Sequence, residues 1–260
     1  MLKIKNKKIM EKTHLIILYL FLTSAIIITA TVITYKALTV PKSKKYVVET
    51  IEANSKGYIK VGIISDAQLP QEEKNLYGWD YATVMNGADH LIKALKYYKS
   101  QNVDMIVFNG DMVNATGDYA AYSAYNKILD YVYGEDRAEA PHIIYPMGNH
   151  EFYGGNQEHN FYKSTGLPLN TRTIVNGYSF ISISNSKLEK GDEELAESND
   201  TLADGTYNEK RIEFLKEQLA AANTEDPNKP IFVFIHMPIS NIVNGGHWAT
   251  PQYEEIYSIL

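Results

Sequence analysis

The chain has 260 residues, of which 45% are hydrophobic, so it can bury the core of one α/β domain that carries an appendage. It contains no cysteine, which excludes disulfides, thiolate metal ligands and cysteine nucleophiles. The net charge of −6 is unevenly divided: the first 45 residues carry +8 and the remainder carries −14. An acidic body argues against binding to a nucleic-acid backbone, which requires a basic face.

The N-terminal segment predicts a membrane anchor. Leu15–Tyr35 contains 21 residues without a charge, and a membrane-spanning helix needs about 20. Five lysines precede it, which by the positive-inside rule places residues 1–14 in the cytoplasm, a single-pass signal anchor at 15–40 and the body outside the cell. A cleaved signal peptide is the alternative, although its apolar region is usually about 7–15 residues long and ends at a small-x-small site. Residues 41–57, with Pro, Lys, Ser and Gly, predict a tether, and residues 58–260 predict the folded domain.

The body alternates between strand-like and helix-like segments. Short β-branched runs predict strands at Tyr58–Ser65, Val103–Asn109, His142–Met147, Tyr178–Ser184 and Ile231–Ile235. Helical spacing of apolar residues predicts helices at Ala88–Ser100, Tyr119–Tyr133, Glu209–Ala222 and Pro251–Leu260, and Lys187–Asp204 predicts an acidic loop. Such alternation predicts the α/β class, with a layered mixed β-sheet flanked by helices.

Four polar motifs each follow one of these strand-like runs. They are Ser65-Asp66-Ala67-Gln68, Gly110-Asp111-Met112-Val113-Asn114, Gly148-Asn149-His150-Glu151 and His236-Met237-Pro238. Asp, Asn, Gln and His supply the oxygen and imidazole donors that hold hard or borderline divalent metals. Loops at the carboxyl ends of strands are where open α/β sheets bind ligands. The motifs together therefore predict a two-metal hydrolytic site.

The order of these motifs resembles that of the calcineurin-like metallophosphoesterases. The pattern of that family runs D-x-H, G-D-x-x-[DN], G-N-H-[ED], a later His before a Pro-containing turn, and then G-H-x-H. The resemblance extends from Tyr58 to the last residue and has two departures. Gln68 stands where the family usually has His, and no G-H-x-H appears before Leu260, so the chain is expected to be the front part of a longer reading frame.

The resemblance implies a role for each motif residue. Asp66 and Gln68 would ligate the first metal, Asp111 would bridge both metals, and Asn149 and His236 would ligate the second. A carboxylate suits the bridging position because its two oxygens can hold two cations about 4 Å apart.

The resemblance also implies the proton chemistry. His150 would be the general acid, since a pKa of about 6.5 lets histidine give and take a proton near neutrality. Asn114 would orient His150 through a hydrogen bond from its side chain, and Glu151 is expected to be a structural hydrogen-bonding partner instead of a base.

The implied function is metal-dependent phosphoester hydrolysis by a phosphatase or phosphodiesterase whose catalytic domain is extracellular. The cofactors would be two divalent ions of manganese, iron or zinc, and the amide oxygen of Gln68 favours manganese. The partners would be a phosphoester substrate and the membrane, and specificity is expected to lie in loops such as Tyr153–Thr165. The alternative function is a catalytically weak, membrane-tethered binding or sensory module, motivated by Gln68 and the absent G-H-x-H.

Overall fold

The structure is a computed structural model that describes residues 46–53, 57–69, 81–114, 119–152, 157–185, 207–239 and 253–260. The strands are β1 (Tyr46–Ile51), β2 (Val61–Ile64), β3 (Met105–Phe108), β4 (His142–Ile144), β5 (Asn170–Val175), β6 (Tyr178–Ser182) and β7 (Ile231–Phe234). The helices are α2 (Tyr81–Ser100), α3 (Tyr119–Tyr133), the short 3₁₀ helix η1 (His150–Phe152), α4 (Gln157–Thr165), α6 (Glu209–Glu225) and α7 (Tyr253–Ile259).

The strands form two sheets. The first sheet has the order β2-β3-β4 and is entirely parallel. The second has the order β1-β5-β6-β7, in which β5 and β6 are antiparallel and the other neighbours are parallel. The predicted α/β class with helix-flanked, mixed strand directions is confirmed, although the strands divide between two sheets.

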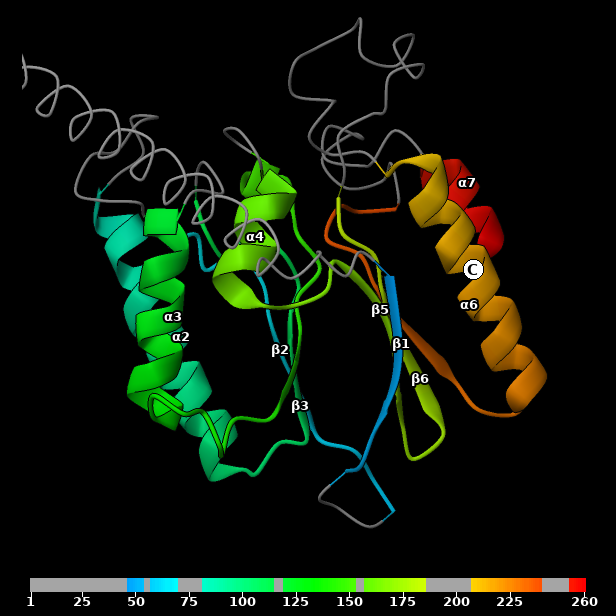
Figure 1. The fold of residues 1–260 in the computed structure, drawn as a ribbon, viewed down its shortest axis with the longest axis horizontal. Helices are drawn as coiled ribbons and strands as arrows, with labels where there is room; N and C mark the ends of the chain where they lie inside the picture. The colour runs from blue at the N-terminus through cyan, green and yellow to red at the C-terminus, as the bar shows by residue number, and fades with distance from the viewer. Residues whose placement is uncertain are drawn as a thin grey trace, which may run out of the picture. The chain divides into compact units, whose positions relative to one another are not determined.

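The two sheets face each other between two layers of helices, as Figure 1 shows. Met105, Val107 and Ile144 from the parallel sheet pack with Val175 and Phe180 from the mixed sheet. Successive side chains of a strand point to opposite faces, so the alternate residues of β3 turn away from this inner core. A strand buried on both faces must be apolar throughout, as the sequence Met-Ile-Val-Phe of β3 is.

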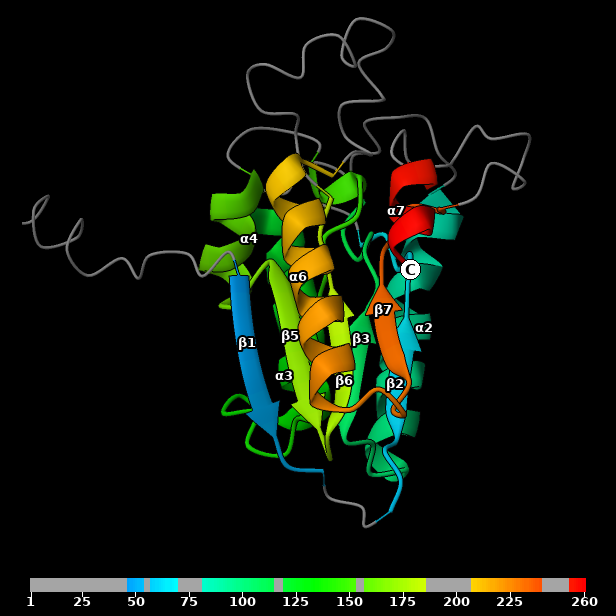
Figure 2. The same ribbon diagram turned by 90° about the vertical axis from the view of Figure 1, so that its right-hand side faces the viewer.

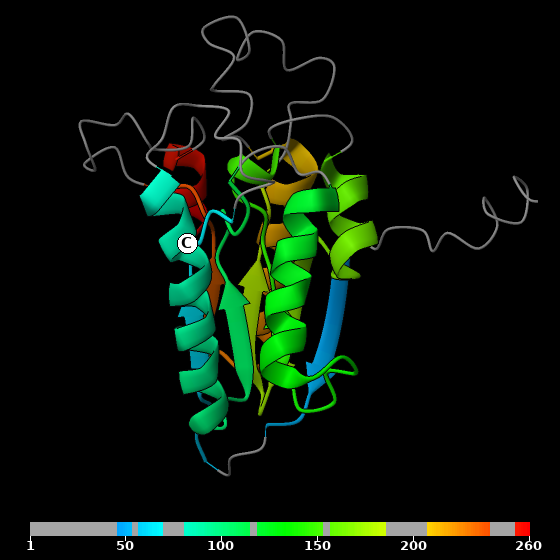
Figure 3. The ribbon, with the colours of Figure 1, turned by 90° about the vertical axis from the view of Figure 1, so that its left-hand side faces the viewer.

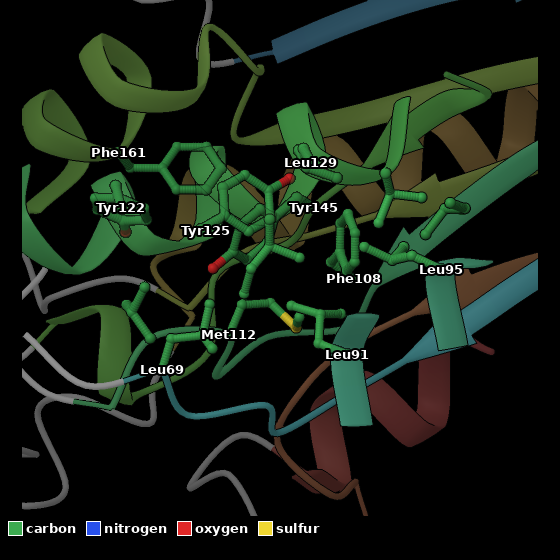
Figure 4. Packing of buried hydrophobic residues seen from close by; sticks show 14 of the residues in the cluster. Leu69, Leu91, Leu95, Phe108, Met112, Tyr122, Tyr125, Leu129, Tyr145 and Phe161 are labelled. Atoms are coloured by element: carbon green, nitrogen blue, oxygen red, sulfur yellow. The ribbon is translucent and has the colours of Figure 1, made fainter. Parts of the chain in front are cut away.

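Helices cover the outer face of each sheet. The helices α2 and α3 pack on the parallel sheet through a cluster that includes Leu91, Leu95, Phe108 and Tyr125 (Figures 3 and 4). The helix α6 covers the mixed sheet, where Leu215 and other apolar residues form a separate cluster (Figure 2).

Apart from the single-turn helix η1, the described residues contain three elements that the sequence analysis does not predict. Strand β1 lies inside the segment 41–57, for which a tether is expected, and its six residues pair with β5. Strand β5 escaped prediction because it is rich in polar residues; its buried Arg172 forms an ion pair with Glu225. It joins β6 through Asn176-Gly177, both in left-handed backbone conformations, which is a hairpin signal present in the sequence. Helix α4 occupies most of the segment Tyr153–Thr165 that was expected to be a loop.

In the part of the chain that the structure describes, no helix is long and apolar enough to cross a membrane. The anchor predicted at 15–40 and the acidic loop predicted at Lys187–Asp204 both lie outside the described residues.

Candidate metal centre

Polar residues from four strand ends meet at one end of the two sheets. Asp66 follows β2, Asp111 follows β3, Asn149 follows β4, and His236 follows β7. A carboxylate oxygen of Asp66, one of Asp111 and a ring nitrogen of His236 all lie within 4.8 Å of one another. The parallel direction of β2, β3 and β4 explains why Asp66, Asp111 and Asn149 lie close together, because it delivers the carboxyl ends of these strands to the same edge.

The imidazole of His236 is held with one ring nitrogen facing this group. Its Nδ1 lies 2.8 Å from the backbone carbonyl oxygen of Asn109, and a carbonyl can only accept, so Nδ1 carries a hydrogen. Its Nε2 lies 3.2 Å from Asp111 Oδ2 and 3.2 Å from Asn149 Oδ1. One nitrogen and two oxygens therefore converge on a small region next to Asp66.

The charge of this group fits a divalent cation. Burial lowers the pKa of His236, but the hydrogen bonds to Asp111 and Asn109 and the negative charges of Asp111 and Glu151 together raise that pKa to about 9. The pocket thus stabilises a positive charge at the position of the Nε2 proton. Since a metal displaces such a proton, and since carboxylate, amide and imidazole donors suit borderline and hard ions, the residues present fit a metal.

His150 also contacts Asp111. Its backbone N–H donates to Asp111 Oδ1 at 2.9 Å, and its Nε2 lies 3.7 Å from Asp111 Oδ2. Its Nδ1 donates to the backbone carbonyl oxygen of Asn114, whereas the prediction used the side chain of that residue. This contact fixes the ring so that Nε2 faces the centre.

Glu151 organises the loops beneath the centre, in agreement with the structural role expected from the sequence. Its carboxylate is fully buried and accepts hydrogen bonds from five groups. The donors are the backbone N–H groups of Asp111, Met112, Val113 and Gly148 and the hydroxyl of Tyr145, at 2.7 to 3.3 Å. One side chain therefore joins the loop after β3 to the loop after β4.

Opposing effects act on the pKa of Glu151. Burial and the neighbouring negative charge of Asp111 raise the pKa of Glu151, and the hydrogen bonds from Tyr145 and the backbone of Asp111 and the charge of His236 offset only part of that rise. The hydrogen-bond donors stabilise the buried carboxylate, as backbone N–H groups do at a helix N-terminus. Substitution of Glu151 should therefore be costly.

Two glycines leave the space that the ligands occupy. A Cβ on Gly110 would lie 2.5 Å from the ring of His236, and one on Gly148 would lie 2.2 Å from Asp111 Oδ1. Both distances are far inside van der Waals contact. The glycines of the G-D and G-N-H-E motifs are thus required for steric reasons.

The backbone of the ligand loops has an uncommon conformation. Asp66, Gln68 and Asp111 have φ values of 58°, 45° and 53°, in the left-handed region that residues other than glycine seldom occupy. Hydrogen bonds between the loops hold them there: Asp66 N–H donates to the Gly110 carbonyl at 3.1 Å, and Gln68 N–H donates to that of Asp111 at 2.9 Å. Backbone strain of this kind concentrates at functional sites.

The structure brings all seven predicted residues to one region in two ways. Side-chain atoms place Asp66, Asp111, Asn149, His150 and His236 in the centre. Backbone hydrogen bonds place Gln68 and Asn114 beside it.

Asn109 and Tyr207 support the centre without having been singled out in the sequence. Asn109 supplies the carbonyl that orients His236, and its side chain donates to the carbonyl of Ile235 at 3.2 Å. Its position directly before Gly110-Asp111 was a usable signal. The hydroxyl of Tyr207 accepts a hydrogen bond from the backbone of Met237, and nothing in the local sequence indicated that contact.

Comparisons with known proteins agree with this geometry. The profile of the family described as calcineurin-like phosphoesterase matches residues 59–257. A solved structure of a dimetal phosphatase from Danio rerio aligns with a TM-score of 0.55 and 18% identity, covering 77% of this chain and 76% of that one, which shows the fold. No curated protein matches the sequence. The chain belongs to the calcineurin-like phosphoesterase family and is a phosphoester hydrolase of that family.

Proposed function

We propose that the chain hydrolyses phosphoesters at a site that holds two divalent metals, with His150 as the general acid. The observation that carries the proposal is the convergence of Asp66, Asp111 and His236 at the carboxyl ends of strands from both sheets. Asp66 and Gln68 would hold one ion, Asn149 and His236 the other, and Asp111 both.

The position of Asp111 supports a bridging role. One oxygen, Oδ2, lies near the ring nitrogens of both His236 and His150, while the other, Oδ1, accepts the backbone N–H of His150. The chemistry supplied by two bound ions is polarisation of the phosphoryl oxygens and a lowered pKa for the attacking water. The protein contributes by fixing these ligands within a rigid, hydrogen-bonded set of loops.

The orientation of His150 supports its role as the acid. Because Nδ1 donates to the carbonyl of Asn114, the doubly protonated, positively charged ring can lose the proton on Nε2 and become neutral with Nδ1 still protonated. Nε2 is the nitrogen that faces Asp111 and hence the reacting groups. The proton that leaves Nε2 would go to the departing alkoxide oxygen of the substrate.

The metals would be manganese, iron or zinc, and we favour manganese. The candidate ligands are rich in oxygen, and Gln68 supplies a neutral oxygen where the family usually supplies an imidazole nitrogen. Oxygen-rich sites suit manganese better than zinc.

The test is metal content and hydrolysis of the full 260-residue chain. The purified chain would be incubated with Mn²⁺, Zn²⁺ or Fe²⁺, and its turnover measured with para-nitrophenyl phosphate and bis-para-nitrophenyl phosphate, which separate monoesterase from diesterase activity. Asp111→Asn should lose both metal and activity. His150→Ala should keep its metal while kcat falls by about 10²–10⁴-fold.

Asp226→Asn serves as the matched control for a lost carboxylate. Asp226 caps the C-terminal end of α6, where asparagine can accept the same hydrogen bond from Asn228. Equal metal content and activity in Asp111→Asn and wild type would rule out the bridging role. If wild type takes up metal but shows no turnover, the hydrolase proposal is wrong and the alternative function, a binding or sensory module, takes its place.

We also propose that residues 15–40 anchor the protein in the cell membrane with the catalytic domain outside. The proposal rests on the uncharged segment Leu15–Tyr35 and on the lysines that precede it. Protease added to intact cells should digest the domain and spare an N-terminal tag. Protection of the domain until the cells are permeabilised would contradict this topology.

A further inference from the structure

A buried hydrogen-bonded bridge joins the two sheets behind the candidate metal centre. Its members are Asn185, which follows β6, and Tyr207, which precedes α6, and their exposed fractions are 0% and 1%. We infer that these two residues are positioning residues that fix the distance between His236 and the loop carrying Asn149. The inference rests on the proposed function.

One half of the bridge holds the end of β4 against the end of β6. The backbone N–H of Asn185 donates to the carbonyl of Met147 at 2.9 Å, and the N–H of Met147 donates to Ser184 Oγ at 2.9 Å. Two hydrogen bonds in opposite directions leave Met147 little freedom to shift along the strand. Met147 immediately precedes Gly148-Asn149, so a ligand loop of the parallel sheet is fastened to the mixed sheet.

The other half of the bridge holds the turn that carries His236. The hydroxyl of Tyr207 donates to Asn185 Oδ1 at 3.2 Å and accepts from the backbone N–H of Met237 at 3.3 Å. A hydroxyl has one hydrogen, so the donation to Asn185 leaves its lone pairs for Met237. The neighbour of His236 is thereby linked to the neighbour of Gly148 through two side chains.

The bridge spans the gap that the metal centre must keep constant. His236 comes from the mixed sheet and Asn149 from the parallel sheet, and their side chains approach to 3.2 Å. Functional constellations require their groups within about 0.5 Å of the productive geometry. Hydrogen bonds that tie the two loops to each other supply this precision more directly than the packing of the sheets does.

The experiment compares Tyr207→Phe with Tyr125→Phe in the full chain. Both tyrosines are buried, but among the described residues the hydroxyl of Tyr125 has no hydrogen-bond partner. Mn²⁺ affinity would be measured by titration calorimetry, kcat and KM by hydrolysis of the better para-nitrophenyl ester, and stability by urea unfolding without metal. Partners that orient metal ligands typically contribute about 10–100-fold to affinity, so Tyr207→Phe should lose that factor and Tyr125→Phe should not.

Asn185→Ala tests the same hydrogen bond from its other end. It keeps the backbone N–H that reaches Met147 and removes the side-chain amide, whose oxygen accepts from Tyr207. It should weaken Mn²⁺ binding in the same direction, and the double variant should be little worse than Tyr207→Phe alone, because both changes break one link.

The outcomes separate this inference from the proposed function. If wild type binds Mn²⁺ while Tyr207→Phe and Asn185→Ala bind it as tightly as Tyr125→Phe does, the positioning role is wrong and the proposed function stands. The positioning role is also wrong if these two variants have a lower urea midpoint but unchanged Mn²⁺ affinity and kcat, because the bridge would then contribute only to stability. If wild type itself neither binds metal nor hydrolyses the esters, both proposals fail.

Discussion

The parallel sheet delivers its candidate ligands on three loops that hold one another, whereas the mixed sheet delivers His236 on a single turn. The loops after β2 and β3 share backbone hydrogen bonds, and Glu151 joins the loop after β3 to the loop after β4. The turn after β7 is fastened by side chains from elsewhere, namely Asn109 and Tyr207.

This difference shows two ways of building one site. Neighbouring parallel strands place their loops side by side, so backbone groups and one buried carboxylate can fix them together. The turn that carries His236 has one such neighbour, the end of β6, and side-chain hydrogen bonds from Asn109 and Tyr207 hold it. Substitutions in the ligand loops of the parallel sheet (the parallel side) should therefore disrupt all of those loops together. Substitutions around the turn after β7 (the mixed side) should weaken metal binding gradually.

The largest effect should come from Glu151→Ala, which breaks the parallel side. The change leaves four buried backbone N–H groups and the hydroxyl of Tyr145 without their acceptor. Each such loss is costly, so the free energy of unfolding should fall by more than about 3 kcal/mol, with loss of metal binding. Urea unfolding and metal analysis measure both, with the exposed Glu217→Ala on α6 as the control. Stability within about 1 kcal/mol of wild type would contradict the organising role.

Gly148→Ala should displace candidate ligands from both sheets. The added Cβ would lie 2.2 Å from Asp111 Oδ1 and 2.7 Å from His236 Cδ2. Overpacking of this kind costs about 1–3 kcal/mol, and displaced ligands should lower Mn²⁺ affinity by at least about tenfold. Calorimetry would compare it with Gly166→Ala, where the left-handed backbone (φ 71°) strains an alanine but a Cβ meets no atom within 4 Å. Equal Mn²⁺ affinities in the two variants would show that the ligand loops can shift to accommodate the added methyl group without loss of metal binding.

Asn109→Ala should weaken the mixed side by a smaller step. It removes the hydrogen bond from the side chain to the carbonyl of Ile235 but keeps the backbone carbonyl that orients His236. A neutral hydrogen bond contributes about 1 kcal/mol, which limits the loss of Mn²⁺ affinity to about fivefold. Asn228→Ala, at the other end of the molecule beside Asp226, is the control. A loss as large as that of Gly148→Ala would contradict the graded behaviour expected of this side.

The smallest effect should come from Asn114→Ala. The atom of Asn114 that contacts His150 is the backbone carbonyl oxygen, which alanine retains. The expected fall in kcat is below about threefold, with an unchanged pH profile, in contrast to His150→Ala. A tenfold fall would restore the side-chain role that the sequence alone suggested.

The motifs were predictable because each one is local. A polar triplet or quartet after a buried β-branched run identifies a strand end, and Asp111, His150 and His236 could be named on that basis. The helix at Tyr119–Tyr133 was predicted with the bounds that the structure gives. Strand β5 was not, since its buried Arg172 reads as an exposed residue until Glu225 is brought to it.

The sequence by itself determined the donor chemistry, the α/β class and the family, since these follow from residue types at short, fixed spacings. Only the tertiary structure decided that the strands divide into two facing sheets and that Asn149 and His236, 87 residues apart, come within 3.2 Å. It alone decided that Asn114 contacts His150 through its backbone and that Asn185 and Tyr207 are hydrogen-bonded to each other. Contacts between distant residues leave no periodicity along the chain, because they are set by how layers pack and not by local conformation.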